Sequence, residues 1–137
     1  AYGAPRTAMR SLKDYEGASL KIRPNLIVVP PALEDDANYL LTAEKFPDGT
    51  PNPYRSTAEV LVMPELASDS AWFLFDTTKP VKPLIYQLRK KTVFVEQPDY
   101  NSDNVFKRKK FLFGAEARCN GGYGFWQMAF GSDGTTE

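Results

Sequence analysis

The sequence predicts an α+β fold with a mostly antiparallel sheet. At least four short segments have the apolar, β-branched and aromatic composition of strands. One segment, at about residues 31–44, has the spacing of an amphipathic helix. Residues 26–63 form the one strand-helix-strand stretch, which leaves room for one parallel pair, and no glycine-rich phosphate loop accompanies it to favour nucleotide binding.

The first third of the chain predicts a short helix and then a buried strand. Residues 5–14 place Ala8, Met9 and Leu12 on one helical side, before Gly17 breaks the pattern. Residues 20–29 begin with alternating apolar positions and end in the run LIVV. Such a run is typical of a strand buried on both faces, so we expect this strand near the centre of the sheet.

A proline corner connects that strand to the helix. Pro30 and Pro31 end the strand because proline donates no ladder hydrogen bond, and Pro31 suits the first helical position. An apolar stripe then follows one face of the helix. An acidic run occupies its first turns, where the helix dipole favours anions. The stripe is Leu33, Ala37, Leu40 and Leu41, and the acidic run is Glu34, Asp35 and Asp36.

Strand patterns dominate the remaining sequence. A proline-rich surface loop at residues 46–54 precedes apolar strands at residues 58–63 and 71–75. Residues 84–95 fit either one long bent strand or a hairpin. Near the end, we expect a strand formed by Val105, Phe106, Phe111, Leu112 and Phe113, turn or bulge glycines at 121, 122 and 124, and a last strand at residues 123–130.

The closing strands are apolar on both sides, so a free hairpin would leave them exposed to water. The chain also has more aromatic residues than one small core needs, and we expect some of them to meet a neighbouring subunit. They are Trp72, Phe73, Phe75, Tyr86, Phe94, Phe111, Phe113, Tyr123, Phe125, Trp126 and Phe130.

Composition argues against most enzyme classes. The 137 residues include no histidine and one cysteine, which removes the commonest general base, the Ser-His and Cys-His dyads and the usual zinc ligands. We therefore expect no catalytic residues, no metal, no cofactor and no small-molecule substrate. Cys119 is expected to be a small buried or half-buried residue. The sequence also has neither a membrane-length apolar run nor a secretory leader.

Two basic runs are the candidate contact residues, either with a second subunit or with nucleic acid. Lysine and arginine can follow phosphates while nearby aromatic rings stack on bases, but lysines on an edge strand also discourage unwanted pairing. Alternate strand residues face opposite ways, so only two of four consecutive basic residues can serve one surface. Lys and Arg equal Asp and Glu at 17 each, so no net charge attracts nucleic acid. The runs are Arg89, Lys90 and Lys91, and Lys107, Arg108, Lys109 and Lys110.

Four segments together resemble the C-terminal half of the Mu-like phage major head subunits, over roughly residues 9–132. They are KIRPNLIVVPPALEDDANYLL, NPYRSTAEVLVMPEL, AWFLFDTTKPVKPLIYQLRKK and SDNVFKRKKFLFGAEARCNGGYGFWQMAFGS. The resemblance implies a non-enzymatic major capsid protein with a fold like that of the Hong Kong 97 phage shell protein. It implies that residues of about 20–100 are axial-domain-like and that residues of about 105–132 return to the peripheral domain.

The chain starts at Ala1, and we expect it to be a piece of a longer protein that lacks the family's N-terminal arm and extended loop. The resemblance implies self-assembly through hexamers and pentamers into an icosahedral head, with double-stranded DNA only as its contents and no membrane partner. It places the protein in the virion, and in the host bacterial cytoplasm during assembly. The alternative is a small nucleic-acid-binding module that uses the basic and aromatic strands.

Overall fold

The computed structural model describes residues 2–97 and 112–135. Within these ranges the chain forms two compact units. The first unit draws on residues 1–83 and 123–137, and the second is built from residues 84–122. The mixture of short helices with mainly antiparallel strands confirms the predicted α+β class.

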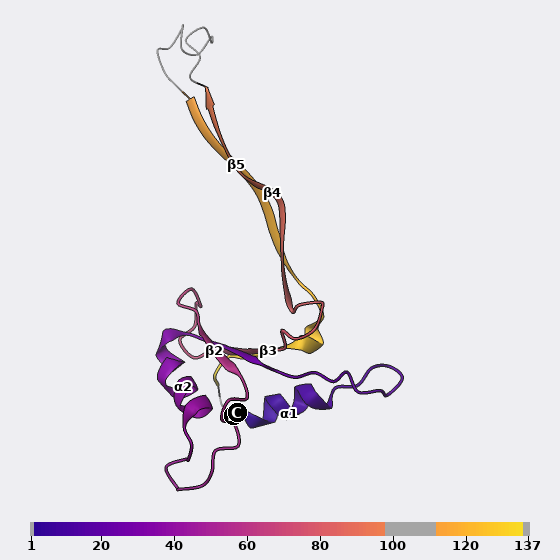
Figure 1. The fold of residues 1–137 in the computed structure, drawn as a ribbon, viewed down its shortest axis with the longest axis vertical. Helices are drawn as coiled ribbons and strands as arrows, with labels where there is room; N and C mark the ends of the chain where they lie inside the picture. The colour runs from indigo at the N-terminus through magenta and orange to yellow at the C-terminus, as the bar shows by residue number, and fades with distance from the viewer. Residues whose placement is uncertain (1, 98–111, 136–137) are drawn as a thin grey trace. The chain divides into compact units, whose positions relative to one another are not determined.

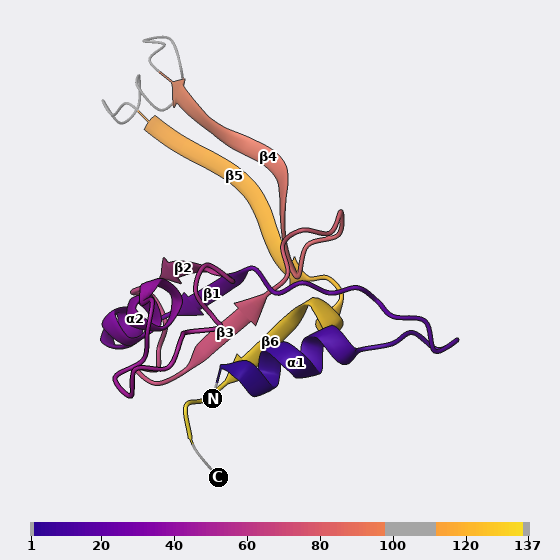
Figure 2. The same cartoon turned by 60° about the horizontal axis from the view of Figure 1, so that its bottom comes forward.

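A four-stranded sheet forms the centre of the first unit (Figure 2). Its strands lie in the order β2, β1, β3, β6. β1 pairs in parallel with β2, the one parallel pair for which the sequence pattern leaves room, and β3 pairs antiparallel with both β1 and β6. The bounds are β1 Leu26–Val29, β2 Glu59–Val62, β3 Trp72–Phe75 and β6 Ala129–Ser132.

β1 is an interior strand, as its apolar run predicts. Ile27, Val28 and Val29 are buried, and Leu74 of β3 is the cross-strand partner of Ile27. Burial of such side chains on both faces contributes roughly 1.5–3 kcal/mol each. The strand is shorter than the predicted residues 20–29, because residues 20–25 form no strand and the first ladder pairs begin at Leu26.

A short 3₁₀ turn, η1 (Pro31–Leu33), leads directly into helix α2 (Glu34–Thr42). The acidic run lies in the first turn of α2, as predicted, and Ala37 and Leu41 of the apolar stripe are buried. Helix α1 (Gly3–Ser11) corresponds to the helix expected at residues 5–14 but lies a little earlier in the sequence. Tyr2 and Met9 anchor α1, since both are buried in the core.

The predicted strand at residues 123–130 is wrong in its extent. Residues Trp126–Met128 form a 3₁₀ turn, η2, and only Ala129–Ser132 form strand β6. Within β6, Gly131 lies opposite Phe73, whose ring covers the place where a glycine side chain would be. β6 therefore completes the first unit's sheet instead of pairing with the strand that precedes it.

The second unit is a two-stranded hairpin of long strands, β4 (Leu84–Gln97) and β5 (Leu112–Tyr123), which run in opposite directions (Figure 1). Residues 84–95 thus belong to one strand, not to a hairpin of their own. Gly121 and Gly122 lie inside β5, so of the two predicted alternatives, a turn or a bulge, the turn is wrong. Val105, Phe106 and Phe111 of the expected strand lie outside the described residues.

Candidate functional site

The hairpin formed by β4 and β5 exposes apolar side chains on both of its faces. In β4, Leu84, Tyr86 and Phe94 retain 64%, 69% and 65% of their accessible surface. Ile85 and Val95, at alternate positions and hence on the opposite face, retain 46% and 56%. A two-stranded hairpin is marginally stable in water, and a large exposed apolar patch usually marks an interaction site.

Aromatic and polar contacts join the two strands. The rings of Phe94 and Phe113 stack with centroids 6.0 Å apart, and both remain mostly exposed. Tyr86 lies beside Cys119, and the pKa of the Tyr86 hydroxyl is raised by a hydrogen bond with the Cys119 sulfur and by the negative charge of that sulfur when it is ionised. Cys119 is free and exposed, so the expectation of a buried or half-buried cysteine is wrong. An exposed thin hairpin has no interior in which a small residue could be enclosed.

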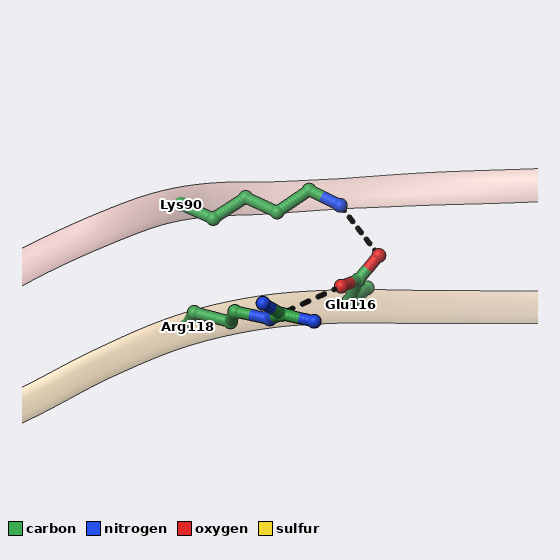
Figure 3. Close-up of polar contacts among 3 residues, drawn as sticks. All are labelled: Lys90, Glu116 and Arg118. Atoms are coloured by element: carbon green, nitrogen blue, oxygen red, sulfur yellow. Dashed lines mark hydrogen bonds and ion pairs between the residues drawn. The ribbon is translucent and has the colours of Figure 1, made fainter.

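A charged cluster crosses the hairpin near its middle (Figure 3). The Glu116 carboxylate of β5 accepts a hydrogen bond from the Lys90 ammonium of β4 at 2.5 Å and lies 3.5 Å from the Arg118 Nε. All three side chains are close to half exposed or more, so each ion pair contributes at most about 1 kcal/mol. The cluster therefore joins the two strands but adds little to the stability of the hairpin.

The predicted basic contact residues lie in different situations. Lys90 is paired with Glu116, whereas Arg89 and Lys91 are exposed and take part in no ion pair among the described residues. Arg89 and Lys91 share one face of β4 because they are two residues apart. Lys107, Arg108, Lys109 and Lys110 lie outside the described residues. A contact role for all seven residues stays a prediction.

Residues 2–97 and 112–135 contain no cluster of three or more side chains suited to hold a metal ion. The acidic residues of α2 are exposed at the start of the helix, consistent with a dipole role. No helix in these ranges has the length and apolar character needed to cross a bilayer.

The first unit contains a buried carboxylate that sequence reasoning did not single out. Asp76 is fully buried and accepts hydrogen bonds from the backbone amides of Arg23 and Thr78, both at 2.8 Å, and from the Thr78 hydroxyl at 2.6 Å. Burial acts to raise the pKa of this carboxyl, but the hydrogen bonds and the Lys79 charge hold it below its usual value. An Asp-Thr-Thr turn signal marks the position, yet the partner at Arg23 is 53 residues away.

These features define the class of protein: an α+β protein with an apolar hairpin whose two exposed faces are suited to contact other molecules. The family model of the Mu-like prophage major head subunit gpT matches residues 1–66 and 65–137. The chain therefore belongs to the Mu-like prophage major head subunit family, which confirms the resemblance seen in its sequence.

Two curated relatives match part of the chain. The Mu-like prophage FluMu major head subunit of Haemophilus influenzae is 45% identical over 60 residues, which cover 44% of this chain and 20% of the relative. The major capsid protein of Escherichia phage Mu is 48% identical over 58 residues, which cover 42% of this chain and 19% of that protein. The matched stretch is thus about a fifth of each relative's length.

One solved structure is similar as well. It is a chain of the procapsid of bacteriophage JBD30, with 26% sequence identity and a TM-score of 0.40. The match covers 94% of this chain and 37% of that chain.

Proposed function

We propose that this chain is part of a major structural protein of a Mu-like phage head. In this proposal it assembles with copies of itself, through hexamers and pentamers, into an icosahedral shell that encloses double-stranded DNA. The observation that carries the proposal is the match of the head-subunit family over the chain, together with curated relatives named as a major head subunit and a major capsid protein. The protein then resides in the virion, and in the bacterial cytoplasm while heads assemble.

The exposed hairpin supplies a physical means of assembly. Its apolar side chains lie on both faces, so neighbouring copies can cover it from two sides. Aromatic side chains such as Tyr86 and Phe94 are typical of residues that dominate interface energies. We expect an interface well above ~2,000 Å² per subunit pair, the range of obligate assemblies.

Finer assignments follow the family resemblance. We propose a fold of the Hong Kong 97 type, with residues of about 20–100 in an axial-like domain and residues of about 105–132 returning to a peripheral domain. Arg89 and Lys91 are proposed to contact acidic groups of neighbouring copies, because they are exposed cations on one face of β4. The role of the protein is structural, with no reaction to catalyse.

The test places charge on the apolar hairpin. Ile85→Lys with Val95→Lys puts two cations on one face of β4, where both side chains are about half exposed and the first unit's core is not involved. We expect assembly to be lost while the folded protein remains, because apolar contacts would be replaced by charge repulsion. Light scattering and electron microscopy of the protein from its complete reading frame measure this.

A matched control adds the same two charges elsewhere. Tyr15 and Tyr39, in the first unit, are 95% and 48% exposed, so Tyr15→Lys with Tyr39→Lys should leave assembly intact. A wild-type protein that stays monomeric and well folded would defeat the proposed function. Equal loss of assembly in both double variants would show that the hairpin is not the assembly surface.

A further inference from the structure

A cavity of about 400 Å³ in the first unit is lined by three arginines. Arg6 and Arg10 come from α1, and Arg23 comes from the segment just before β1. Three hydroxyl residues, Ser56, Thr57 and Thr78, contribute to the same wall. Since no acidic side chain lines this cavity, its walls carry only positive charge.

Local packing explains why the arginines meet. Arg6 and Arg10 are four residues apart on α1, so their side chains leave the same face of the helix. Tyr2 fixes the start of α1: its hydroxyl lies 3.1 Å from the Thr57 Oγ1, and its ring packs edge-on against Tyr54. Arg23 is positioned from the other side, because its backbone amide is bonded to buried Asp76.

The three guanidinium groups have no anionic partner among residues 2–97 and 112–135. Their positive charges are therefore uncompensated within this part of the chain, and an anion in the cavity would compensate them.

Asp76 does not supply that anionic group, although it lies close in the sequence to Thr78. One of its oxygens binds the Arg23 amide, and the other binds the amide and the hydroxyl of Thr78. Asp76 does not line the cavity. The hydrogen bonds of its carboxylate go to the Arg23 amide and to Thr78, and the carboxylate forms no ion pair with the three arginine side chains in the described part of the chain.

We propose that this cavity binds a phosphate group. Guanidinium groups match phosphate oxygens geometrically and bind them through charge-assisted hydrogen bonds. Phosphate brings about two negative charges and four oxygens, whereas one carboxylate would leave two of the three cations uncompensated. Ser56 is held at the cavity wall with φ of 56°, a left-handed conformation that non-glycine residues seldom adopt.

The occupant is a discrete phosphate, either free or at the end of a small molecule such as a nucleoside monophosphate. A DNA duplex needs basic groups spaced along its backbone, which a single recess does not provide. The chain's net charge of zero also gives no general attraction to a polyanion. The site does not depend on the assembly function proposed above.

The experiment is calorimetric titration of the protein with inorganic phosphate, with chloride used to hold the ionic strength constant. Wild-type protein should bind phosphate, and phosphate should raise its Tm relative to chloride. Arg10→Gln with Arg23→Gln should weaken binding by at least about tenfold, since each removes a charge-assisted contact. Both residues are exposed, so their replacement should leave the fold intact by circular dichroism.

The control double variant, Arg55→Gln with Arg118→Gln, removes two exposed arginines that do not line the cavity and should bind phosphate like wild type. Titration with adenosine monophosphate identifies the source: tighter binding than inorganic phosphate indicates a terminal phosphate, and exclusion indicates free phosphate. No binding at ~10 mM phosphate, equal weakening in both double variants, or displacement of phosphate by a short DNA duplex would overturn the proposal.

Discussion

The carboxylate of Asp76 accepts a hydrogen bond of 2.8 Å from the backbone amide of Arg23, 53 residues earlier in the chain. A second hydrogen bond joins the same two segments: Asn25 Oδ1 accepts a bond of 2.8 Å from the backbone amide of Thr77. The backbone amide of Asp76 is bonded to the carbonyl of Met128, beside β6. The entry of β1, the exit of β3 and the turn before β6 are therefore joined at one corner.

Loss of the Asp76 carboxylate should destabilise the first unit. Asp76→Ala leaves two backbone amides and the Thr78 hydroxyl without their acceptor, at a cost of about 3 kcal/mol in free energy of unfolding. Denaturant unfolding measures the change. Asp48→Ala is the matched control, because Asp48 makes the same pair of bonds to Thr50 on the exposed surface and should change stability little.

Acid should remove the contribution of Asp76. Its folded-state pKa lies below the ordinary value of 3.8, so the unfolded chain takes up the proton first as pH falls. The stabilisation is fully present above about pH 5, declines as pH falls past the unfolded pKa and is lost once the folded pKa is passed. The Tm difference between wild type and Asp76→Asn should therefore shrink below about pH 4. A difference that stays constant from pH 7 to pH 2 would contradict this.

The Lys90 and Glu116 pair should couple the hairpin strands only weakly. Both side chains are nearly half exposed, so solvent screens their attraction. A double-mutant cycle with Lys90→Met and Glu116→Gln should give a coupling energy of about 0.2–1 kcal/mol that decreases in 1 M salt. The pair of Arg55 with Glu44, at 3.9 Å and more exposed, serves as the comparison and should couple less. A coupling above about 2 kcal/mol would show that the pair is shielded from water.

Local patterns were sufficient to predict the centre of the first unit. The LIVV run, the proline corner and the helix stripe each depend on neighbours within a few residues, and each lies where the pattern indicates. The parallel pairing of β1 with β2 also follows, since a helix connects them. The spacing of apolar residues and the positions of the prolines predict these features without any knowledge of tertiary contacts.

The long hairpin and the arginine-lined cavity could not be predicted from the sequence, because both depend on contacts between distant segments. The basic run Arg89, Lys90 and Lys91 interrupts the apolar alternation of β4. The sequence of this segment is therefore as typical of a hairpin of two short strands as of one long strand. Arg6, Arg10 and Arg23 show no shared motif, and they meet only because Tyr2 and Asp76 fix two distant segments. The family resemblance indicates the functional class, a phage head subunit. Composition alone only argues against most classes of enzyme.

The glycines after residue 120 should differ sharply in their tolerance of a side chain. A Cβ at Gly124 would overlap the carbonyl oxygen of Lys82, and the Gly124 amide is bonded to the carbonyl of Pro83 at 2.9 Å. Backbone cannot move aside as a flexible side chain can, so Gly124→Ala should cost about 1–3 kcal/mol in free energy of unfolding.

Gly121 provides the contrasting case three residues earlier. Nothing lies within 4 Å of a Cβ placed there, and its φ is not among the positive values. Gly121→Ala should be neutral or stabilise by up to about 1 kcal/mol, because alanine reduces the freedom of the unfolded chain. Thermal unfolding of both variants, followed by circular dichroism, tests the contrast. A Gly124→Ala protein as stable as Gly121→Ala would mean that the segment around Lys82 does not approach the chain after β5.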